Sequence, residues 1–495
     1  MACCRSILTY ASPVWWNHSK SLIRPLTLTQ NKALRWVSGA FRTTPVRALE
    51  ILTSIPPLEL ILNHINRQTA IRFSKLPENH LILHRLDLGW LAPETEMVSP
   101  PNRVRQLVLD AYRDPTARQR DYSTLYEIAK FNSPSNERCN PLALPPWKRS
   151  HTNPGLRNRI TITPYDGHTP KGIIRELHNQ VTDRWKNDSD HLVCYTDASR
   201  WIDQGERLMG AGIGVAIFHK STRIHSISKQ VQNQVEPWDL ELEAIKIAIR
   251  TATEITTRFE PNPPKNIHIF SDNTSAIEVA LEGHASAGQK TCISIRDHVF
   301  RFIDAHPEHT VSIQYCPGHA EIRGHDLADK LAKRASSHRR NIIGLKTLTN
   351  IKRESKAKTT DEWFEIWSTR EPSGFFAPAD RTPPSMKPSK TLLNTARPIF
   401  PRLTQVLTGH AFIGEYYERF VPDEISSCPC GEHPQTRQHI LLDCPNYADF
   451  RHLFTTERGD LLSLPEILGT PKGIDKLISF LEHTNAFTKQ DNPMA

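Results

Sequence analysis

The pattern of apolar and polar positions changes along the 495-residue chain, and it is clearest over residues 186–338. Short apolar runs there predict strands, and apolar residues spaced three or four apart predict helices. The predicted strands are His191–Asp197, Ala211–Phe218, Arg223–Val231, Asn266–Ser271 and Thr310–Cys316, and the predicted helices are Glu236–Glu254, Ala276–Leu281, Gln289–Ala305 and Asp326–Ala335. The alternation of strands with helices predicts an α/β domain.

The regions on either side have weaker patterns. Residues 1–90 have helical periodicity, with Pro56-Pro57 separating two helices. Residues 91–185 are rich in proline and polar residues, so we predict a linker with one helix at Arg103–Arg113. Beyond the α/β domain we predict a basic linker with helices at 339–420, a small Cys/His module at 421–450 and a tail at 451–495.

Composition and charge narrow the class of protein. The 62 Lys and Arg against 53 Asp and Glu leave a net charge of +9, which favours a polyanionic partner such as nucleic acid. Because no apolar run approaches the roughly 20 residues of a membrane span, we expect no membrane partner. The odd number of cysteines and the lack of a signal-peptide pattern predict an intracellular protein, in the nucleus or the cytoplasm. The oligomeric state stays open.

Four acidic residues occupy positions that the predicted elements can bring together. Asp197 and Asp272 come at the ends of two strands, Glu241 lies in the first helix of the domain and Asp329 in the last. Clustered carboxylates repel one another, and Mg²⁺ or Mn²⁺ relieves that repulsion with oxygen ligands. Two such ions can activate water and stabilise the leaving oxygen in phosphodiester cleavage. Singly, Asp272 could instead cap a helix and Glu241 could be a solvated charge.

The motifs around these acids resemble those of a type 1 ribonuclease H domain. The matching strings are Tyr195–Ser199, Gly210–Gly214, Glu241–Ile245, Phe270–Asn273 with Ala276-Ile277, Pro317–His319 and Gly324–Ala332. Their order and spacing agree over about 150 residues. The resemblance implies a ribonuclease H-like fold, with a mixed five-stranded sheet flanked by helices.

The resemblance also implies roles for individual residues. His319 takes the position of a mobile histidine that assists proton transfer or product release, although it could be a locally packed loop histidine. The family often has asparagine and glutamate where this chain has His325 and Asp326, and we do not count Asp326 as a ligand. The implied ligands of two Mg²⁺ or Mn²⁺ ions are Asp197, Glu241, Asp272 and Asp329.

The implied substrate is the RNA strand of an RNA–DNA hybrid. Such an enzyme must sense 2′-hydroxyls on one strand and deoxyribose on the other. We expect Ser199, Asn273 and Ser275 to contact the substrate beside the metals, although each could simply cap a helix. The implied reaction is endonucleolytic and leaves 5′-phosphate and 3′-hydroxyl ends.

Residues 7 to about 75 resemble the segment that follows the polymerase palm in non-LTR (LINE-type) retrotransposon proteins. There this segment forms the reverse transcriptase thumb and the connection to the ribonuclease H domain. The palm's paired aspartates are missing, so we expect no DNA synthesis and interpret the chain as the C-terminal part of a longer element protein. The matching strings are Ile7–Trp15, Gln30–Arg35, Gly39–Pro45 and Ile55–Leu60, and the basic residues that could touch phosphates are Lys32, Arg35, Arg42 and Arg47.

A Cys/His cluster near the C-terminus has the spacing C-x-C-x8-H-x4-C. Its residues are Cys428, Cys430, His439 and Cys444, with His433 as an alternative to His439. Three thiolates and one imidazole complete a tetrahedral Zn²⁺ site, and a closed set of four ligands predicts structural zinc. The cluster resembles the zinc knuckle at the C-termini of some non-LTR retrotransposon proteins, a kind of module that often contacts nucleic acid. Free cysteines beside a surface histidine are the alternative.

Together these features predict a ribonuclease H that cuts RNA–DNA hybrids with two metal ions. One alternative is a catalytically inactive, nucleic-acid-binding relic of a retrotransposon protein. Another keeps the fold but cuts DNA, as transposases and integrases do. Glu241 and the His319 loop disfavour the DNA-cutting alternative, and the intact set of four acids disfavours the relic.

Overall fold

The computed structural model describes residues 2–77, 158–202, 208–231, 235–259, 261–337, 344–372 and 374–489, together with 80, 82, 128, 136–145, 147 and 152–156. The predicted helix at Arg103–Arg113 lies outside these residues. The chain divides into two compact units, and the described parts of the first are residues 2–67 and 355–489. Among the described helices, none is both long and apolar enough to cross a membrane.

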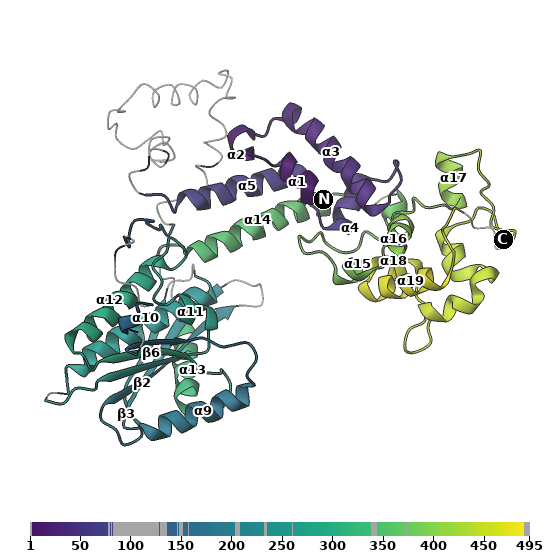
Figure 1. Cartoon of the computed structure of the whole chain (residues 1–495). Coiled ribbons are helices and arrows are strands. Elements are labelled where there is room, and N and C mark those ends of the chain that lie inside the picture. The colour runs from purple at the N-terminus through teal and green to yellow at the C-terminus, as the bar shows by residue number, and fades with distance from the viewer. Residues whose placement is uncertain are drawn as a thin grey trace, which may run out of the picture. The chain divides into compact units, whose positions relative to one another are not determined.

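The second unit is built on a mixed sheet of six strands in the order β1-β6-β5-β2-β3-β4 (Figure 1). Strand β3 pairs antiparallel with β2 and with β4, whereas β5, β6 and β1 run parallel to β2. Their bounds are β1 Ile160–Thr163, β2 His191–Ile202, β3 Leu208–His219, β4 Thr222–Val231, β5 Asn266–Ser271 and β6 Thr310–Tyr315. The predicted α/β, ribonuclease H-like fold with a mixed sheet is confirmed.

The sheet has one strand more than the five predicted. Strand β1 pairs with the outer side of β6 and lies in the region expected to be a linker. Its four residues, alternating isoleucine and threonine, are too short for a clear period-two signal. Helix α9 (Lys171–Arg184) lies in the same region, and the pattern missed it because His178 is its one buried residue.

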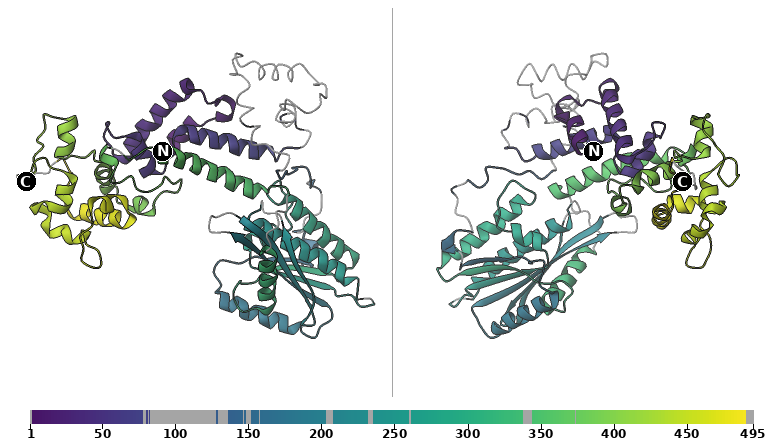
Figure 2. Two further views of the ribbon diagram at one scale, coloured as in Figure 1. Left: turned by 180° about the vertical axis from the view of Figure 1, so that it is seen from behind. Right: turned by 45° about the vertical axis from the view of Figure 1, so that its right-hand side comes forward.

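Helices cover both faces of this sheet (Figure 2). On one face, α10 (Pro237–Thr256), α11 (Thr274–Val279) and α12 (Gln289–Ala305) enclose the main apolar core. On the other face, α9 and α13 (Arg323–Ser336) cover a smaller cluster around Tyr195 and Phe270. A short turn, η3 (Pro154–Leu156), precedes β1.

Two glycines of β3 determine how closely α13 approaches the sheet. A Cβ on Gly214 would overlap the carbonyl oxygen of Ala328, and one on Gly212 would lie 2.5 Å from the Cβ of Ala335. Without side chains at these positions, the backbone of α13 lies directly on β3. Since Asp329 is on α13, these glycines help to set its position.

The first unit is helical. Its N-terminal part contains α1 to α5, and α4 ends before Pro56-Pro57 as predicted, with α5 starting after it. Its C-terminal part contains η4 (Gly374–Phe376), α15 (Lys390–Asn394), α16 (Ile399–Thr408), α17 (Gly414–Phe420), η5 (His439–Asp443), η6 (Pro445–Phe454), α18 (Leu464–Gly469) and α19 (Pro471–His483). The bounds of the remaining helices are α1 Ala2–Leu8, α2 Ser12–Trp15, α3 Lys20–Ser38, α4 Val46–Thr53, α5 Leu58–Phe73 and α14 Leu348–Ser368.

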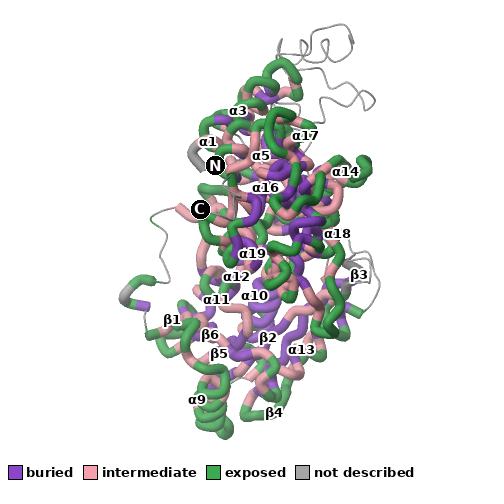
Figure 3. Tube along the Cα trace, turned by 90° about the vertical axis from the view of Figure 1, so that its right-hand side faces the viewer, coloured by how far each residue is buried: buried purple, intermediate pink, exposed green. Residues whose placement is uncertain are grey.

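The residues predicted as a tail contribute to the core of the first unit. Phe454, Phe480 and Phe487 are fully buried there. Figure 3 shows buried stretches of the chain at α16 and α19. The N-terminal segment packs against the same cluster through Phe41 and Leu52. The side chain of Gln405 donates a hydrogen bond of 2.9 Å to the carbonyl of Gly39, and Arg67 pairs with Glu362 at 3.1 Å. Both ends of the described chain therefore build one unit.

Candidate active site and zinc centre

The pairing of strands brings Asp197 and Asp272 together. The sequence pattern places Asp197 at the end of its strand, but β2 continues to Ile202, so Asp197 lies within it. The parallel pairing of β2 with β5 stops at Tyr195 opposite Phe270, and β5 ends at Ser271. Asp272 follows immediately, so both carboxylates lie where the parallel part of the sheet ends. This is the edge at which α/β sheets form their sites.

Glu241 enters the same site from α10. That helix begins with a capping box, in which the Glu236 N–H donates to Asp239 Oδ2 at 2.9 Å. Burial, and then the negative charges of Asp197 and Asp272, raise the pKa of Glu241 well above its usual value. Among the described residues, no group donates a hydrogen bond to its buried Oε2.

Asp197 is a second buried carboxyl of this site with a raised pKa. It is 7% exposed. Burial is the largest cause that raises its pKa to about 7, and the charges of Asp272 and Asp329 add to it. Asp329, on α13, accepts a hydrogen bond of 2.7 Å from Lys333 one turn later. The four predicted acids thus act on one another electrostatically within one cluster.

A histidine that was not predicted as a site residue joins the cluster. His325 is 3% exposed, and its Nε2 lies 3.6 Å from Asp272 Oδ2. Burial favours its neutral form, but the hydrogen bond and charge of Asp272 outweigh that effect and raise the pKa of His325. Ligand atoms of Asp197, Asp272 and His325 all lie within 4.8 Å of one another. The unusual histidine in the closing motif was the signal that could have identified it.

The cluster has the chemistry of a site for divalent cations. Three carboxylates converge from a strand, a loop and a helix, and burial, with the charges of neighbouring acids, raises the pKa values of Asp197 and Glu241. Among the described residues, none supplies Glu241 Oε2 with the donor that a buried carboxylate normally has. Hard oxygen donors in this number fit Mg²⁺ or Mn²⁺.

The remaining predicted site residues lie around this cluster in different settings. His319 is exposed, in the loop between β6 and α13, with a left-handed φ of 54°. Asn273 caps α11, because its Oδ1 accepts a hydrogen bond of 3.0 Å from the N–H of Ala276. Asp272 is therefore not the cap. Ser199 receives a hydrogen bond of 3.2 Å from Ser336, and Ser275 is exposed.

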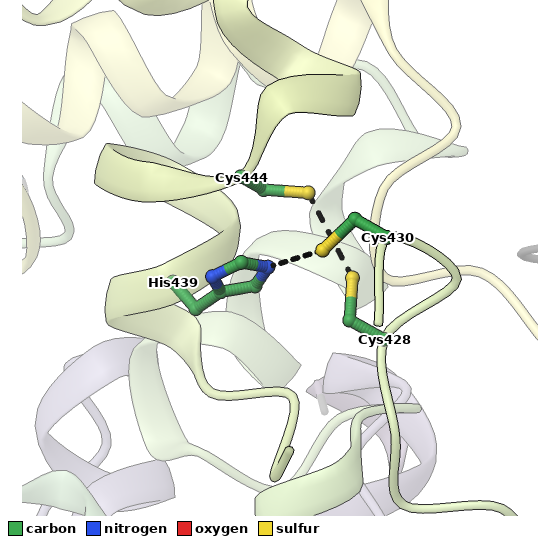
Figure 4. A group of neighbouring side chains, drawn as sticks. All are labelled: Cys428, Cys430, His439 and Cys444. Carbon is green, nitrogen blue, oxygen red and sulfur yellow. Dashed lines mark hydrogen bonds between the residues drawn. The ribbon is translucent and has the colours of Figure 1, made fainter. Parts of the chain in front are cut away.

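The Cys/His residues form a second cluster, in the first unit (Figure 4). Cys430 Sγ lies 3.1 Å from His439 Nε2, and Cys428 Sγ lies 3.7 Å from Cys444 Sγ. A tight turn supplies the first two cysteines, with the Gly431 N–H donating to the Cys428 carbonyl at 2.8 Å. His439 starts η5, and Cys444 follows its end. One ligand atom from each residue lies within 4.8 Å of the others, which fits a tetrahedral ion.

His433, the alternative ligand, lies outside that cluster. It is exposed, and it makes contacts of 3.2 Å with Ser427 and 3.4 Å with Glu418. Within the cluster, burial raises the pKa of the Cys444 thiol to about 12, so a thiolate there requires a cation. The ligand set that the structure brings together is therefore the one that contains His439 rather than His433.

Two of the basic residues near the N-terminus are engaged within the first unit. Arg47 pairs with Asp380 at 3.1 Å, and Arg35 donates to the Thr44 carbonyl at 3.2 Å. Lys32 and Arg42 are exposed. Of the four predicted basic residues, Lys32 and Arg42 are therefore the two with exposed side chains.

Comparison with known proteins agrees with the fold. Residues 189–337 match the family model described as RNase H, so this part of the chain is similar to ribonuclease H domains. The curated relatives are Pol polyproteins of R1 retrotransposable elements. One from Nasonia vitripennis is 32% identical over 78 residues, which are 15% of this chain and 20% of that protein. One from Popillia japonica is 31% identical over 125 residues, 24% of this chain and 44% of that protein. The matches thus span less than half of either relative.

Solved ribonuclease H structures are also similar to part of the chain. The N-terminal RNase H domain of a Mycobacterium tuberculosis protein is 12% identical, with a TM-score of 0.23, over 30% of this chain and 99% of that one. An RNase H1 isolated from compost, solved with an RNA/DNA hybrid, is 18% identical, with a TM-score of 0.22, over 29% of this chain and 98% of that one.

Proposed function

We propose that this chain hydrolyses the RNA strand of RNA–DNA hybrids endonucleolytically, as part of a retrotransposon-derived protein. The observation that carries the proposal is the cluster of Asp197, Glu241, Asp272 and Asp329 within a ribonuclease H domain. Two of these carboxyls are buried with raised pKa values, an arrangement that is costly without cations.

In this proposal the four acids hold two divalent cations. Bound there, the cations would activate water and stabilise the leaving oxygen of the scissile phosphate. Asp197 and Asp272 face each other across the end of the parallel strands, and Glu241 and Asp329 approach from the helices on the two faces of the sheet.

The surrounding residues would handle the substrate. His319 is exposed on its loop, so it is free to approach the phosphate and give a proton to the leaving 3′-oxygen. The products are then 5′-phosphate and 3′-hydroxyl ends. Ser199, Asn273 and Ser275 follow Asp197 and Asp272 within three positions of the sequence, and in this proposal their polar side chains would meet the 2′-hydroxyls of the RNA strand.

The zinc centre has a structural role in this proposal. Cys428, Cys430, His439 and Cys444 would hold one Zn²⁺ and tie the turn at 428–431 to η5. A knuckle of this kind, with exposed Lys32 and Arg42 in the same unit, would add contacts to nucleic acid. In this proposal the protein acts inside the cell, in the nucleus or cytoplasm, which the free cysteines of the described residues support.

A cleavage assay on an end-labelled hybrid tests the proposal. The full chain is incubated with Mg²⁺, Mn²⁺ or EDTA, beside the Asp197→Asn variant, and with DNA duplex and RNA duplex as control substrates. We expect metal-dependent cutting of the RNA strand of the hybrid, lost in the variant while hybrid binding is retained. Binding without cutting by either metal would identify the inactive relic, and cutting of the DNA duplex would identify the DNA-cutting alternative.

A further inference from the structure

His325 is placed as a ligand would be, on the first turn of α13. Its Nε2 points at Asp272, 3.6 Å from Oδ2, and the ligand atoms of Asp197, Asp272 and His325 lie within 4.8 Å of one another. These atoms come from a strand, a loop and a helix. One cation could contact all three after small rotations of the side chains.

The surroundings of His325 do not account for it as a packing residue. Buried histidines in a core usually have both ring nitrogens hydrogen-bonded. Here Nδ1 is buried, and no described group accepts or donates a hydrogen bond to it. The other nitrogen, Nε2, lies 3.6 Å from Asp272 Oδ2. The buried Oε2 of Glu241, which also lacks a described partner, is a second polar atom of the same cluster left unsatisfied.

The loop before α13 runs close to these atoms. Gly318 has no side chain, and a Cβ there would overlap Asp272 Oδ2 and lie 3.4 Å from His325 Nε2. A larger residue would therefore displace the carboxylate or the imidazole. The glycine allows the loop to approach both groups without disturbing them.

We propose that His325 Nε2 is a nitrogen ligand of the cation held by Asp197 and Asp272, and that it makes the site prefer Mn²⁺ to Mg²⁺. This inference rests on the proposed function for the presence of the cation, and adds a ligand and a metal preference to it. Mg²⁺ takes oxygen ligands almost exclusively, whereas first-row transition metals accept imidazole nitrogen. Replacing one oxygen ligand by nitrogen thus penalises Mg²⁺ more than Mn²⁺.

Pulsed electron paramagnetic resonance of Mn²⁺ bound to the zinc-loaded full chain tests the ligand directly. A directly coordinated ¹⁴N modulates the spin echo, whereas a histidine with a structural role does not. We expect this modulation in the natural chain, its replacement by a ¹⁵N signal after labelling with [¹⁵N]histidine, and its persistence in His319→Ala. The labelled natural chain needs no substitution, so the test stands even if a variant fails to fold.

The His325→Asn variant provides the second measurement. We expect the ¹⁴N modulation to disappear and Mn²⁺ affinity to fall about tenfold, with a smaller change for Mg²⁺. Absence of nitrogen modulation in the natural chain, or its persistence in His325→Asn, would overturn the inference. Nitrogen coordination without hybrid cleavage would defeat the proposed function and leave the ligand assignment intact. Cleavage without nitrogen coordination would support the proposed function and overturn the ligand assignment.

Discussion

Replacing Asp197 by asparagine should stabilise the metal-free ribonuclease H domain while it abolishes cleavage. In the folded domain the pKa of Asp197 is raised from 3.8 to about 7, chiefly by burial. One pKa unit corresponds to about 1.4 kcal/mol, so ionised Asp197 costs at most about 4 kcal/mol above pH 7. Asparagine keeps the shape and removes the charge.

The pH dependence follows from the direction of the shift. Because the folded pKa lies above the unfolded value, the folded domain holds this proton more tightly. The cost is absent below about pH 4, grows as pH rises toward the folded pKa of about 7, and is complete above it. The natural domain should therefore lose stability between pH 4 and 7, and Asp197→Asn should lose less.

Calorimetric unfolding of the full chain in EDTA, at pH 5 and pH 8, measures the effect. Relaxation of the cluster should reduce the gain to roughly 2 kcal/mol, or about 4–8 °C in the domain's transition at pH 8. At pH 5 the gain should fall to less than half of its value at pH 8, because the folded carboxyl is protonated there while the unfolded one is already ionised. Asp183→Asn, at an exposed position on α9, is the matched control and should change little. An equal gain at both pH values, or none at pH 8, would refute the reasoning.

Three other substitutions test different parts of the structure. Gly214→Ala should push α13 away from β3, destabilise the domain by about 2–3 kcal/mol in denaturant unfolding, and reduce cleavage by displacing Asp329. The control Gly172→Ala, at a position in open space on α9, should be neutral. Equal stability of the two variants would contradict the packing argument. Cys444→Ser should reduce bound zinc, measured by mass spectrometry, from about one ion per chain to near zero, whereas His433→Ala should retain it, and zinc loss in His433→Ala would point to a different ligand set. His319→Ala should lower kcat about 100-fold with little change in KM, and an unchanged kcat would remove this histidine from proton transfer.

Local motifs in the sequence were sufficient to find the Cys/His cluster and the pair Asp197 and Asp272, which the structure brings together, while the roles of all four acids stay predictions. Each acid lies in a distinctive string, and these strings lie in elements whose pairing brings them together. The strings could not show that β2 runs on past Asp197, because its continuation is set by pairing with β3 rather than by its own apolar pattern. His325 was missed for a similar reason. Its burial against Asp272 depends on how α13 lies on the sheet.

The arrangement of the first unit was beyond local reasoning altogether. Phe41 and Leu52 pack on a cluster whose other members lie more than 320 positions later, and no periodicity within either segment reports that contact. The short helices α18 and α19 were predicted as a tail for the same reason. Their apolar residues are recognisable as core only beside α16.

The shared core of the first unit has a consequence for synthesis on the ribosome. The segment carrying Phe41 emerges early, but the cluster that it joins is completed only by Phe480 and Phe487. At about 5–20 residues per second, it waits roughly 20–90 seconds for them. In the sequence, the ribonuclease H domain lies between these two segments, so all of its residues are synthesised before Phe480 and Phe487. We expect the nascent chain to acquire its catalytic sheet first, while its earliest helices depend on a chaperone or on their own small cluster around Trp16 until translation ends.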